Sequence, residues 1–366
     1  MASNATTLPG FARAPHPAPR AADERAAILA NPGFGATFTD HMVEIDFDAE
    51  HGWHAPRVVP YGPIALDPAA AVLHYAQEIF EGMKAYRLAD GGIALFRPRA
   101  NAARFNASAR RLAMPEMPEA LFVEAVRQQV LADSDWFPTV EGGSLYLRPF
   151  MFASEAFLGV RPSRAYKFMV IASPAGNYFK SGSPAVSLWV SDYTRAAQGG
   201  TGAAKCGGNY AASLVPTAEA FARGHDQVLF LDAAEHRWVD DLGGMNLFFR
   251  FADGSIVTPP LSGTILPGIT RDSLITLARE EGLTVREERY ALDQWRADAA
   301  SGALVETFAC GTAAVVTPVG KVADTQGEFV IGSGGPGQLT QKLRQRLVEI
   351  QRCEGPDTHG WVERIA

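Results

Sequence analysis

The centre of this 366-residue chain reads Gly199-Gly-Thr-Gly-Ala-Ala-Lys205-Cys-Gly-Gly-Asn-Tyr210. One lysine stands among residues with small side chains or none, although the whole chain has only six lysines. A surface lysine needs no such surroundings, whereas a lysine that condenses with a bulky aldehyde needs backbone that leaves room for the adduct. A glycine-rich surface loop with an incidental lysine would have the same spacing, so the stretch alone leaves both interpretations open.

Two further segments carry small residues before a regular element. Leu266-Pro-Gly-Ile269-Thr270 predicts a tight turn that leads into a helix over 271–281, with Thr270 as its N-cap. The start of such a helix favours an anion, so the segment is either a phosphate site or an ordinary capped helix. Gly311-Thr312-Ala313 predicts a turn that opens an apolar strand, and alone it indicates little.

Two adjacent acids, Asp240 and Asp241, precede Leu-Gly-Gly-Met-Asn246 in an otherwise apolar segment. We expect a strand over 238–251, in which alternation turns the two acids to opposite faces. An acid that points inward needs a positive or hydrogen-bond-donating partner. A solvated strand end is the alternative interpretation.

A glycine pattern near the C-terminus, Gly332-Ser-Gly334-Gly-Pro-Gly337, has the spacing of a dinucleotide-binding fingerprint. Too little chain follows Gly337 for a second parallel strand with a ribose-binding acid. We therefore expect a glycine turn before a helix over 338–351, and a nicotinamide oxidoreductase is the weaker alternative.

Composition narrows the classes of function. Lys and Arg total 33 against 40 Asp and Glu, a formal charge of −7, and we find no basic run that would suit nucleic acid. No apolar stretch is long enough to cross a membrane. The three cysteines, Cys206, Cys310 and Cys353, form no C-x-x-C pair, so we expect neither a metal site nor a dithiol motif and favour a reducing cytoplasm.

The predicted elements interleave helices and strands without a strict βαβ rhythm, which favours an α+β fold in two domains. We expect helices over 68–82, 98–113 and 117–133, and strands over 144–152, 166–173, 186–191 and 227–232, the last in an antiparallel arrangement. The predicted organisation is a flexible or loosely docked tail (1–30), a small N-terminal domain (31–173), a linker or lid (174–184) and a larger C-terminal domain (185–366).

Taken together, the segments resemble class IV pyridoxal-phosphate enzymes and, more closely, the branched-chain-amino-acid aminotransferases. The resemblance runs from Asn31 to the C-terminus and includes Phe34-Gly-Ala-Thr-Phe-Thr-Asp-His-Met42 and Leu145-Tyr-Leu-Arg-Pro149. It also includes residues 73–86, 95–104, 207–210, 241–249, 266–271 and 310–318. It implies the two-domain fold type IV, similar to D-amino-acid aminotransferase, and a homodimer.

The resemblance implies pyridoxal 5'-phosphate as the cofactor and a role for each matching residue. Lys205 would form the Schiff base and move the substrate's α-proton, and Tyr210 would bind the cofactor's phenolate oxygen. Asp241 takes the place of the family's glutamate that pairs with the pyridinium nitrogen, one methylene shorter. The phosphate would be held by Arg104 and by the backbone at Ile269, Thr270 and Thr312.

For the substrate, the resemblance implies an apolar pocket lined by Phe34, Tyr75, Tyr146 and Val160. Tyr75 and Val160 would come across a dimer interface. Thr312 and Ala313 would offer backbone N–H groups to the substrate carboxylate, and Arg148 would receive the distal carboxylate of glutamate or 2-oxoglutarate. The implied reaction is reversible, ping-pong amino transfer between Leu, Ile or Val and 2-oxoglutarate.

Two related activities remain as alternatives, those of D-amino-acid transaminases and aminodeoxychorismate lyases. Those chains tend to be shorter and lack the segments at 34–42 and 145–149. Some family members carry a C-x-x-C pair where this chain has Ala314 and Thr317, so we expect no thiol switch there.

Overall fold

The computed structural model describes residues 10–176 and 185–366, and the chain divides into two compact units. The first comprises Met1–Tyr178, Gln351–Cys353 and Asp357–Ala366, and the second comprises Phe179–Ile350 and Glu354–Pro356. The C-terminal segment joins the first unit because β17 (Val362–Arg364) pairs with β6 (Ile93–Phe96), whereas the sequence had placed it in the second domain. The predicted lid falls mainly on residues 177–184, which lie outside the described residues, so its role stays a prediction.

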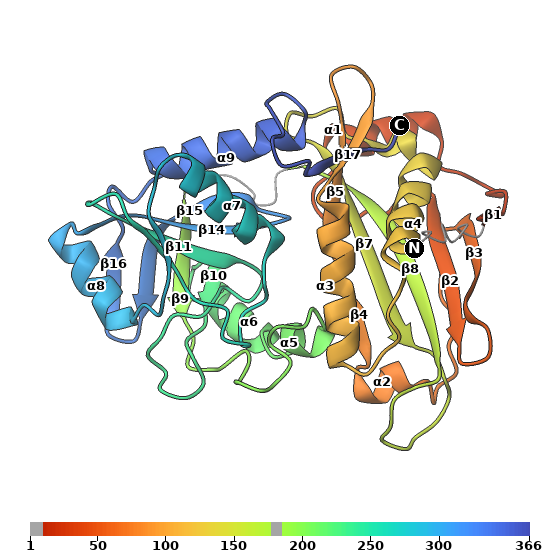
Figure 1. Cartoon of the computed structure of the whole chain (residues 1–366), viewed down its shortest axis with the longest axis horizontal. Coiled ribbons are helices and arrows are strands. Elements are labelled where there is room, and N and C mark those ends of the chain that lie inside the picture. The colour runs from red at the N-terminus through yellow and green to blue at the C-terminus, as the bar shows by residue number, and fades with distance from the viewer. Residues whose placement is uncertain (1–9, 177–184) are drawn as a thin grey trace, which may run out of the picture. The chain divides into compact units, whose positions relative to one another are not determined.

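The first unit is built on a mostly antiparallel sheet with the strand order β1-β3-β2-β8-β7-β5-β6-β17, and β4 pairs with β7 (Figure 1). The remaining strands are β1 (Ala12–Arg13), β2 (His41–Asp48), β3 (Gly52–Pro60), β4 (Glu78–Phe80), β5 (Met83–Arg87), β7 (Ser144–Ala153) and β8 (Ala165–Ala175). Helices α3 (Pro98–Arg111) and α4 (Glu119–Ala132) pack on this sheet and agree with the predicted spans. Phe105 and Phe122 of these helices contact each other and Phe168 of β8, with ring centroids 5.2–5.8 Å apart.

The predicted helix over 68–82 is wrong for most of its length. Helix α2 (Ala71–Tyr75) ends where Ala76 adopts a left-handed conformation, with φ of 47°. The chain then pairs with β7 as strand β4, which buries Ile79 completely. Gly82 is needed for packing rather than as a helix end, because a Cβ there would lie 2.3 Å from the Tyr146 hydroxyl.

The described part of the N-terminal segment contacts the first unit at several points. Strand β1 pairs with β3, and helix α1 (Ala22–Ala30) follows it. The Arg20 amide donates to Asp40 at 3.1 Å, and the Arg20 guanidinium lies 5.5 Å from the Trp136 ring centroid, beside the short 3-10 helix Ser134–Trp136. These contacts are more extensive than the loosely docked tail that the sequence predicted.

The second unit contains a mixed sheet with the order β10-β9-β15-β14-β11-β12-β13, and β16 pairs with β15. Its strands are β9 (Val186–Val190), β10 (Gln227–Leu229), β11 (Asn246–Phe251), β12 (Ile256–Thr258), β13 (Val285–Glu287), β14 (Leu304–Gly311), β15 (Val315–Asp324) and β16 (Gly327–Val330). Its helices are α5 (Gly207–Ala211), α6 (Leu214–Ala222), α7 (Ile269–Glu280), α8 (Leu292–Ser301) and α9 (Gln338–Gln351). Leu247 and Phe249 of β11 form its core with Trp295 of α8.

Two strand predictions in this unit need correction. Strand β10 pairs with β9 in parallel, and the expected antiparallel arrangement of 227–232 with 238–251 is limited to one bridge between Leu231 and Val239. The predicted strand over 238–251 is regular only from Asn246, and residues 240–245 form a loop. The alternation that would send Asp240 and Asp241 to opposite faces therefore does not apply.

The glycine pattern at 332–337 leads into α9 at the predicted position, but strand β16 before it is antiparallel to β15. Gly337 is required because a Cβ there would lie 1.9 Å from the Glu306 carboxylate carbon. That carboxylate accepts hydrogen bonds from the amides of Leu339 at 3.1 Å and Thr340 at 2.9 Å. The start of α9 thus binds a carboxylate of the chain itself, which is the physical reason for the glycine turn.

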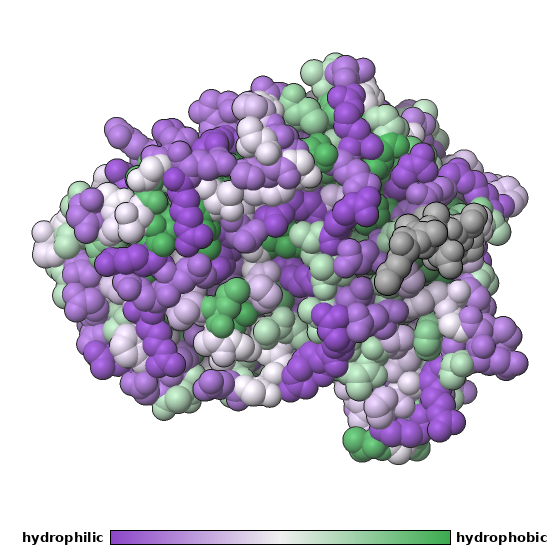
Figure 2. Space-filling model, in the orientation of Figure 1, coloured by the Kyte–Doolittle hydropathy of each residue, from purple (hydrophilic) through white to green (hydrophobic). Residues whose placement is uncertain are grey.

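The molecular face drawn in Figure 2 is mainly hydrophilic, with scattered apolar residues, as is usual for surfaces in contact with water. Within the described ranges, no helix combines the length and the apolar character that crossing a membrane requires.

Candidate active site

The glycine-rich stretch places the Lys205 amine beside a phenol. Cys206 is extended and α5 begins at Gly207, so the chain turns through one short helix after the lysine. Lys205 Nζ donates a hydrogen bond to the Tyr210 hydroxyl at 2.8 Å, and both side chains are half-buried. The stretch is therefore not a loop with an isolated lysine, because it pairs the amine with a second reactive group.

Asn209, to which the sequence assigned no role, holds the loop before Lys205 in place. Its Oδ1 accepts from the Thr201 hydroxyl at 2.7 Å, and its Nδ2 donates to the carbonyls of Thr201 and Ala204 at 2.8 Å. Gly202 lets this loop approach Thr264, because a Cβ would lie 2.6 Å from the Thr264 Cα atom. The small residues around Lys205 thus serve close packing as well as access.

Asp241 is buried in a two-point ion pair with Arg195. Arg195 Nε donates to Asp241 Oδ1 at 3.0 Å, and Arg195 Nη2 donates to Oδ2 at 2.9 Å. The Gly243 amide also donates to Oδ1, at 2.9 Å. Sequence reasoning predicted that a buried acid would need such a partner but did not identify Arg195, which lies 46 residues away.

Asp240 is half-buried and has different surroundings. Burial and the neighbouring Asp241 carboxylate raise the pKa of Asp240 to about 6, against a hydrogen bond with Thr264 that lowers it. The two adjacent acids therefore differ in their electrostatic environment, and only Asp241 has a guanidinium bonded to both oxygens.

The helix start expected at Thr270 is present, with a different cap. Helix α7 begins at Ile269 after an extended Gly268, so Thr270 lies in the first turn and is not the N-cap. Gly268 stands there because a Cβ would lie 2.0 Å from Asn246 Oδ1, and Asn246 Nδ2 donates to the Leu266 carbonyl at 3.2 Å. The N-terminal end of such a helix attracts anions through its backbone N–H groups.

The Thr312 turn lies at the same end of the sheet as the start of α7. Residues 312–314 connect β14 to β15, and Asn246 pairs with Cys310 just before this turn. Gly311 approaches the loop after Asp241, since a Cβ there would lie 3.3 Å from the Gly244 carbonyl oxygen. Asn246 and Thr264 therefore link the loops that carry Lys205, Asp241, Thr270 and Thr312 within the second unit.

Arg104, on α3 of the first unit, is held by a buried acid that the sequence did not reveal. Arg104 Nε and Nη2 donate to the two carboxylate oxygens of Glu81, both at 2.8 Å. Asn101 Nδ2 donates to the same carboxylate at 2.8 Å. Glu81 has no exposed surface, so this carboxylate fixes the orientation of the guanidinium.

Three other predicted residues of the first unit lie together. Phe34 and Tyr146 make an edge-to-face contact with ring centroids 5.0 Å apart. The Arg148 guanidinium lies 4.6 Å from the Phe80 ring centroid, and Arg148 Nη2 donates to the Tyr146 hydroxyl at 3.3 Å. Within the described part of the chain, Arg148 has no carboxylate in ion-pair range, and its buried Nε has no acceptor.

Tyr75 contacts the segment of the first unit that carries Val160. The Tyr75 hydroxyl donates to the Leu158 carbonyl, two residues before Val160. Val160 is 89 % exposed.

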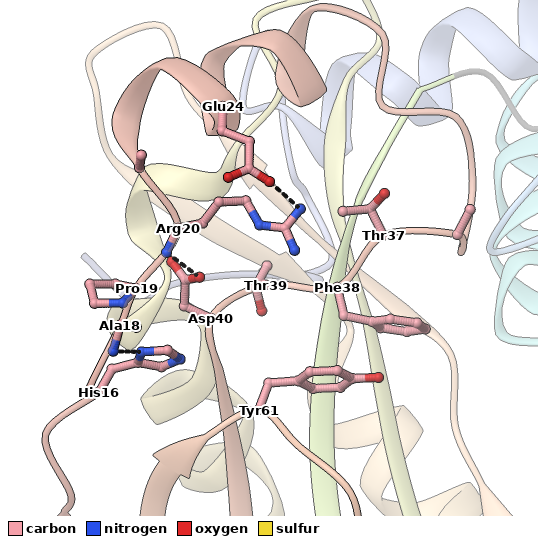
Figure 3. A pocket seen from close by; sticks show the side chains of 12 residues that line it. His16, Ala18, Pro19, Arg20, Glu24, Thr37, Phe38, Thr39, Asp40 and Tyr61 are labelled. Atoms are coloured by element: carbon pink, nitrogen blue, oxygen red, sulfur yellow. Dashed lines mark hydrogen bonds and ion pairs between the residues drawn. The ribbon is translucent and has the colours of Figure 1, made fainter.

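A hollow of about 600 Å³ in the first unit has none of the predicted site residues in its lining (Figure 3). Its wall includes Phe38 and Tyr61, whose rings stack 5.1 Å apart. Its polar groups already have partners, because Arg20 pairs with Glu24 at 3.6 Å and Asp40 accepts the Arg20 amide. We find no reactive group there that would support catalysis.

Among the residues with described coordinates, no group of three or more His, Cys, Asp and Glu side chains is placed to hold a metal ion. Cys206, Cys310 and Cys353 are free thiols. Burial raises the pKa of the Cys310 thiol to about 12, so it stays protonated near neutral pH.

Comparisons with known proteins place the chain in a family. The family model "Amino-transferase class IV" matches residues 78–322. The branched-chain-amino-acid aminotransferase of Mycolicibacterium smegmatis is 58% identical over 346 residues, which is 93% of this chain and 94% of that protein. The protein of the same name in Mycobacterium tuberculosis is 56% identical over 358 residues, 96% of this chain and 97% of that protein.

Solved structures share the fold. The Escherichia coli branched-chain amino acid aminotransferase has a TM-score of 0.76 and 28% identity, and the match covers 89% of this chain and 99% of that chain. The T.th. enzyme of the same name, solved with pyridoxamine 5'-phosphate, has a TM-score of 0.73 and 32% identity, covering 88% and 98%. The family and the fold class expected from the motifs are confirmed: the chain belongs to the class IV aminotransferases.

Proposed function

We propose that this protein is a pyridoxal-phosphate-dependent branched-chain-amino-acid aminotransferase, which transfers an amino group between Leu, Ile or Val and 2-oxoglutarate. The observation that carries the proposal is the hydrogen bond from the Lys205 amine to the Tyr210 hydroxyl. The chain that holds this pair is 58% identical to an enzyme of that name, and the match covers 93% of this chain. The two half-reactions would use one site in turn, which is a ping-pong mechanism.

The residues present fit pyridoxal phosphate. A half-buried amine next to a phenol suits its aldehyde and phenolate oxygen, and a buried carboxylate paired with arginine suits its ring nitrogen. The start of α7 and the backbone at Thr312 would offer N–H groups to its phosphate, and Arg104 would add a positive charge. When bound, the cofactor supplies the electron sink for negative charge at the substrate's α-carbon.

Lys205 would hold the cofactor and then, as a free amine, move the proton at the substrate's α-carbon. The Tyr210 hydroxyl would orient the amine, as its 2.8 Å hydrogen bond to Nζ supports. Asn209 keeps the backbone before Lys205 in one conformation, so the amine returns to the same place after each half-reaction.

The substrate pocket needs an apolar wall and one anion-binding group. Phe34 and Tyr146 would form the wall for a branched side chain, and Thr312 and Ala313 would bind the α-carboxylate through backbone N–H groups. Arg148 would bind the distal carboxylate of glutamate or 2-oxoglutarate, since its Nε has no acceptor and no acid neutralises it among the described residues.

We further propose a cytoplasmic homodimer. The Tyr75 hydroxyl donates to the Leu158 carbonyl, two residues before the strongly exposed Val160, and exposed apolar residues at one place suit a surface that a second copy covers. In the dimer, these residues would line the side-chain pocket of the partner. Three free cysteines and no disulfide among the described residues suit a reducing compartment.

The proposal is tested by loading purified protein with pyridoxal phosphate and reducing it with borohydride. We expect a visible absorption band that reduction abolishes, with the label on Lys205 in peptide mass spectrometry. Loaded enzyme should convert Leu, Ile and Val with 2-oxoglutarate and leave D-alanine unchanged. A label on another lysine, or a preference for D-alanine, would contradict the assignment.

A further inference from the structure

Arg195 is the least expected group of the candidate site. Arg195 and Asp241 are both nearly buried, with 7% and 3% of their surface exposed. Arg195 Nη2 also donates to the Thr264 carbonyl at 2.5 Å. Because Gly202 of the Lys205 loop packs directly on Thr264, the guanidinium is anchored from the same side as the lysine loop.

A buried ion pair of this kind is a poor explanation of stability by itself. Removing two charges from water costs free energy that their attraction often only offsets, and apolar replacements can be equally stable. Here the pair also lies beside Asp240, a second acid in partly buried surroundings. Stability of the fold alone therefore does not explain why Arg195 and Asp241 are buried as an ion pair.

The hydrogen bonds around Asp241 show which oxygen is available to a ligand. A carboxylate oxygen accepts about two hydrogen bonds. Oδ1 already accepts two, from Arg195 Nε and the Gly243 amide, whereas Oδ2 accepts one, from Arg195 Nη2. Of the donors that the structure describes, none uses the remaining position on Oδ2.

The guanidinium also distinguishes the two adjacent acids by their hydrogen-bond partners. Arginine stays protonated in proteins, and its fork matches a carboxylate at two points. Both of its bonds go to Asp241, while Asp240 is bonded by the neutral Thr264 hydroxyl.

We infer that Arg195 is a positioning residue that fixes the orientation of the Asp241 carboxylate, so that Oδ2 would face the protonated ring nitrogen of the cofactor. This inference rests on the proposed function and deepens it, since it gives the shorter acid a fixed place in the site. Arg195 itself acts through Asp241 and needs no contact with the cofactor.

The test compares the affinity of the apoprotein for pyridoxal phosphate with its affinity for the analogue in which carbon replaces the ring nitrogen. Both bind through the same aldehyde and phosphate, so only the ring nitrogen differs. We expect Arg195→Gln to weaken pyridoxal phosphate about 10-fold or more, the effect of losing one charge-assisted hydrogen bond, and to leave the analogue within about twofold. Arg195→Lys should lie between the wild type and Arg195→Gln.

Arg296→Gln is the matched control. Arg296 lies on α8, outside the candidate site, and its Nη2 donates to Asp324 Oδ2 at 2.6 Å. This variant should leave the ratio of the two affinities unchanged. Asp241→Asn should lower the ratio of the pyridoxal phosphate affinity to the analogue affinity, as Arg195→Gln does. The double variant Arg195→Gln with Asp241→Asn should lower this ratio no further. The double variant also removes both charges together, so it is available if Arg195→Gln alone fails to fold.

Equal weakening of both ligands by Arg195→Gln would make Arg195 structural and overturn the inference, as would no change in either. A further fall of the ratio in the double variant would mean that Arg195 acts on the cofactor directly, which also overturns it. Wild-type protein that forms no bond between Lys205 and pyridoxal phosphate would instead contradict the proposed function, so the two failures are distinguishable.

Discussion

Glu81 holds Arg104 in a buried two-point ion pair, in which each carboxylate oxygen accepts one guanidinium N–H at 2.8 Å. Glu81→Gln should destabilise the protein by about 3–5 kcal/mol, because it leaves a buried guanidinium without its counter-charge. Denaturant unfolding of the apoprotein measures this loss. Glu116→Gln is the control: its pair with Arg110 is largely exposed and should contribute at most about 1 kcal/mol.

The same variant should weaken pyridoxal phosphate more than pyridoxal, which lacks the phosphate, if Glu81 orients Arg104 toward the phosphate. The comparison is made by equilibrium titration of the two ligands, with Arg104→Gln as the reference for complete loss of the contact. If Glu81→Gln weakened the binding of both ligands equally, Glu81 would have only a structural role.

Lys205→Ala should bind pyridoxal phosphate without a covalent bond and lose transamination. The variant lacks the amine that is hydrogen-bonded to Tyr210 and that would form the bond to the cofactor. Absorbance spectra and mass spectrometry after borohydride reduction measure the bond, and a coupled assay measures turnover. Lys321→Ala, which alters a lysine paired with Glu328 at 3.1 Å, should keep both properties. Near-normal turnover of Lys205→Ala would show that the lysine was assigned wrongly.

Arg148→Ala should impair glutamate and 2-oxoglutarate far more than leucine. Loss of a charge-assisted contact costs about 1.5–3 kcal/mol, which is about 10- to 150-fold in kcat/KM. Steady-state kinetics with each substrate measure the two effects separately. Tyr146→Phe removes only the hydroxyl that Arg148 contacts and should have a much smaller effect on this selectivity. Equal losses for both substrate classes would remove Arg148 from the pocket.

Asp240 should make the protein less stable as the pH rises from about 4 to about 6. Its pKa is raised to about 6 in the folded state, so between these values the folded chain keeps a proton that the unfolded chain has lost. Stability therefore falls through this window and is level above it. Asp240→Asn should remove this part of the pH dependence, so its free energy of unfolding relative to wild type should rise from pH 4 to pH 6.

Chemical denaturation at several pH values measures that difference. Asp253→Asn serves as a control, because hydrogen bonds from Ser255 lower the pKa of Asp253, so that its effect on stability falls below this pH window. A difference between Asp240→Asn and wild type that stays constant from pH 4 to pH 6 would contradict the burial of this carboxylate.

The sequence by itself determined the family, the helices at α3, α4 and α9, and the residues expected at the site. Amphipathic spacing and glycine positions are local properties, and they identify a helix or a turn without knowledge of its neighbours. The glycines at 199–208 belong to this kind of evidence, because glycine permits backbone conformations and close approaches that other residues do not.

Tertiary structure alone decided the partners of the charged residues. Arg195 meets Asp241 across 46 residues and Glu81 meets Arg104 across 23, and no local pattern selects one arginine among many. The same holds for Gly268, which is the N-cap in place of the expected Thr270 and leaves no room for a side chain beside Asn246. Such contacts depend on which segments pack together, and a buried charge must take whichever partner the packed chain brings within reach.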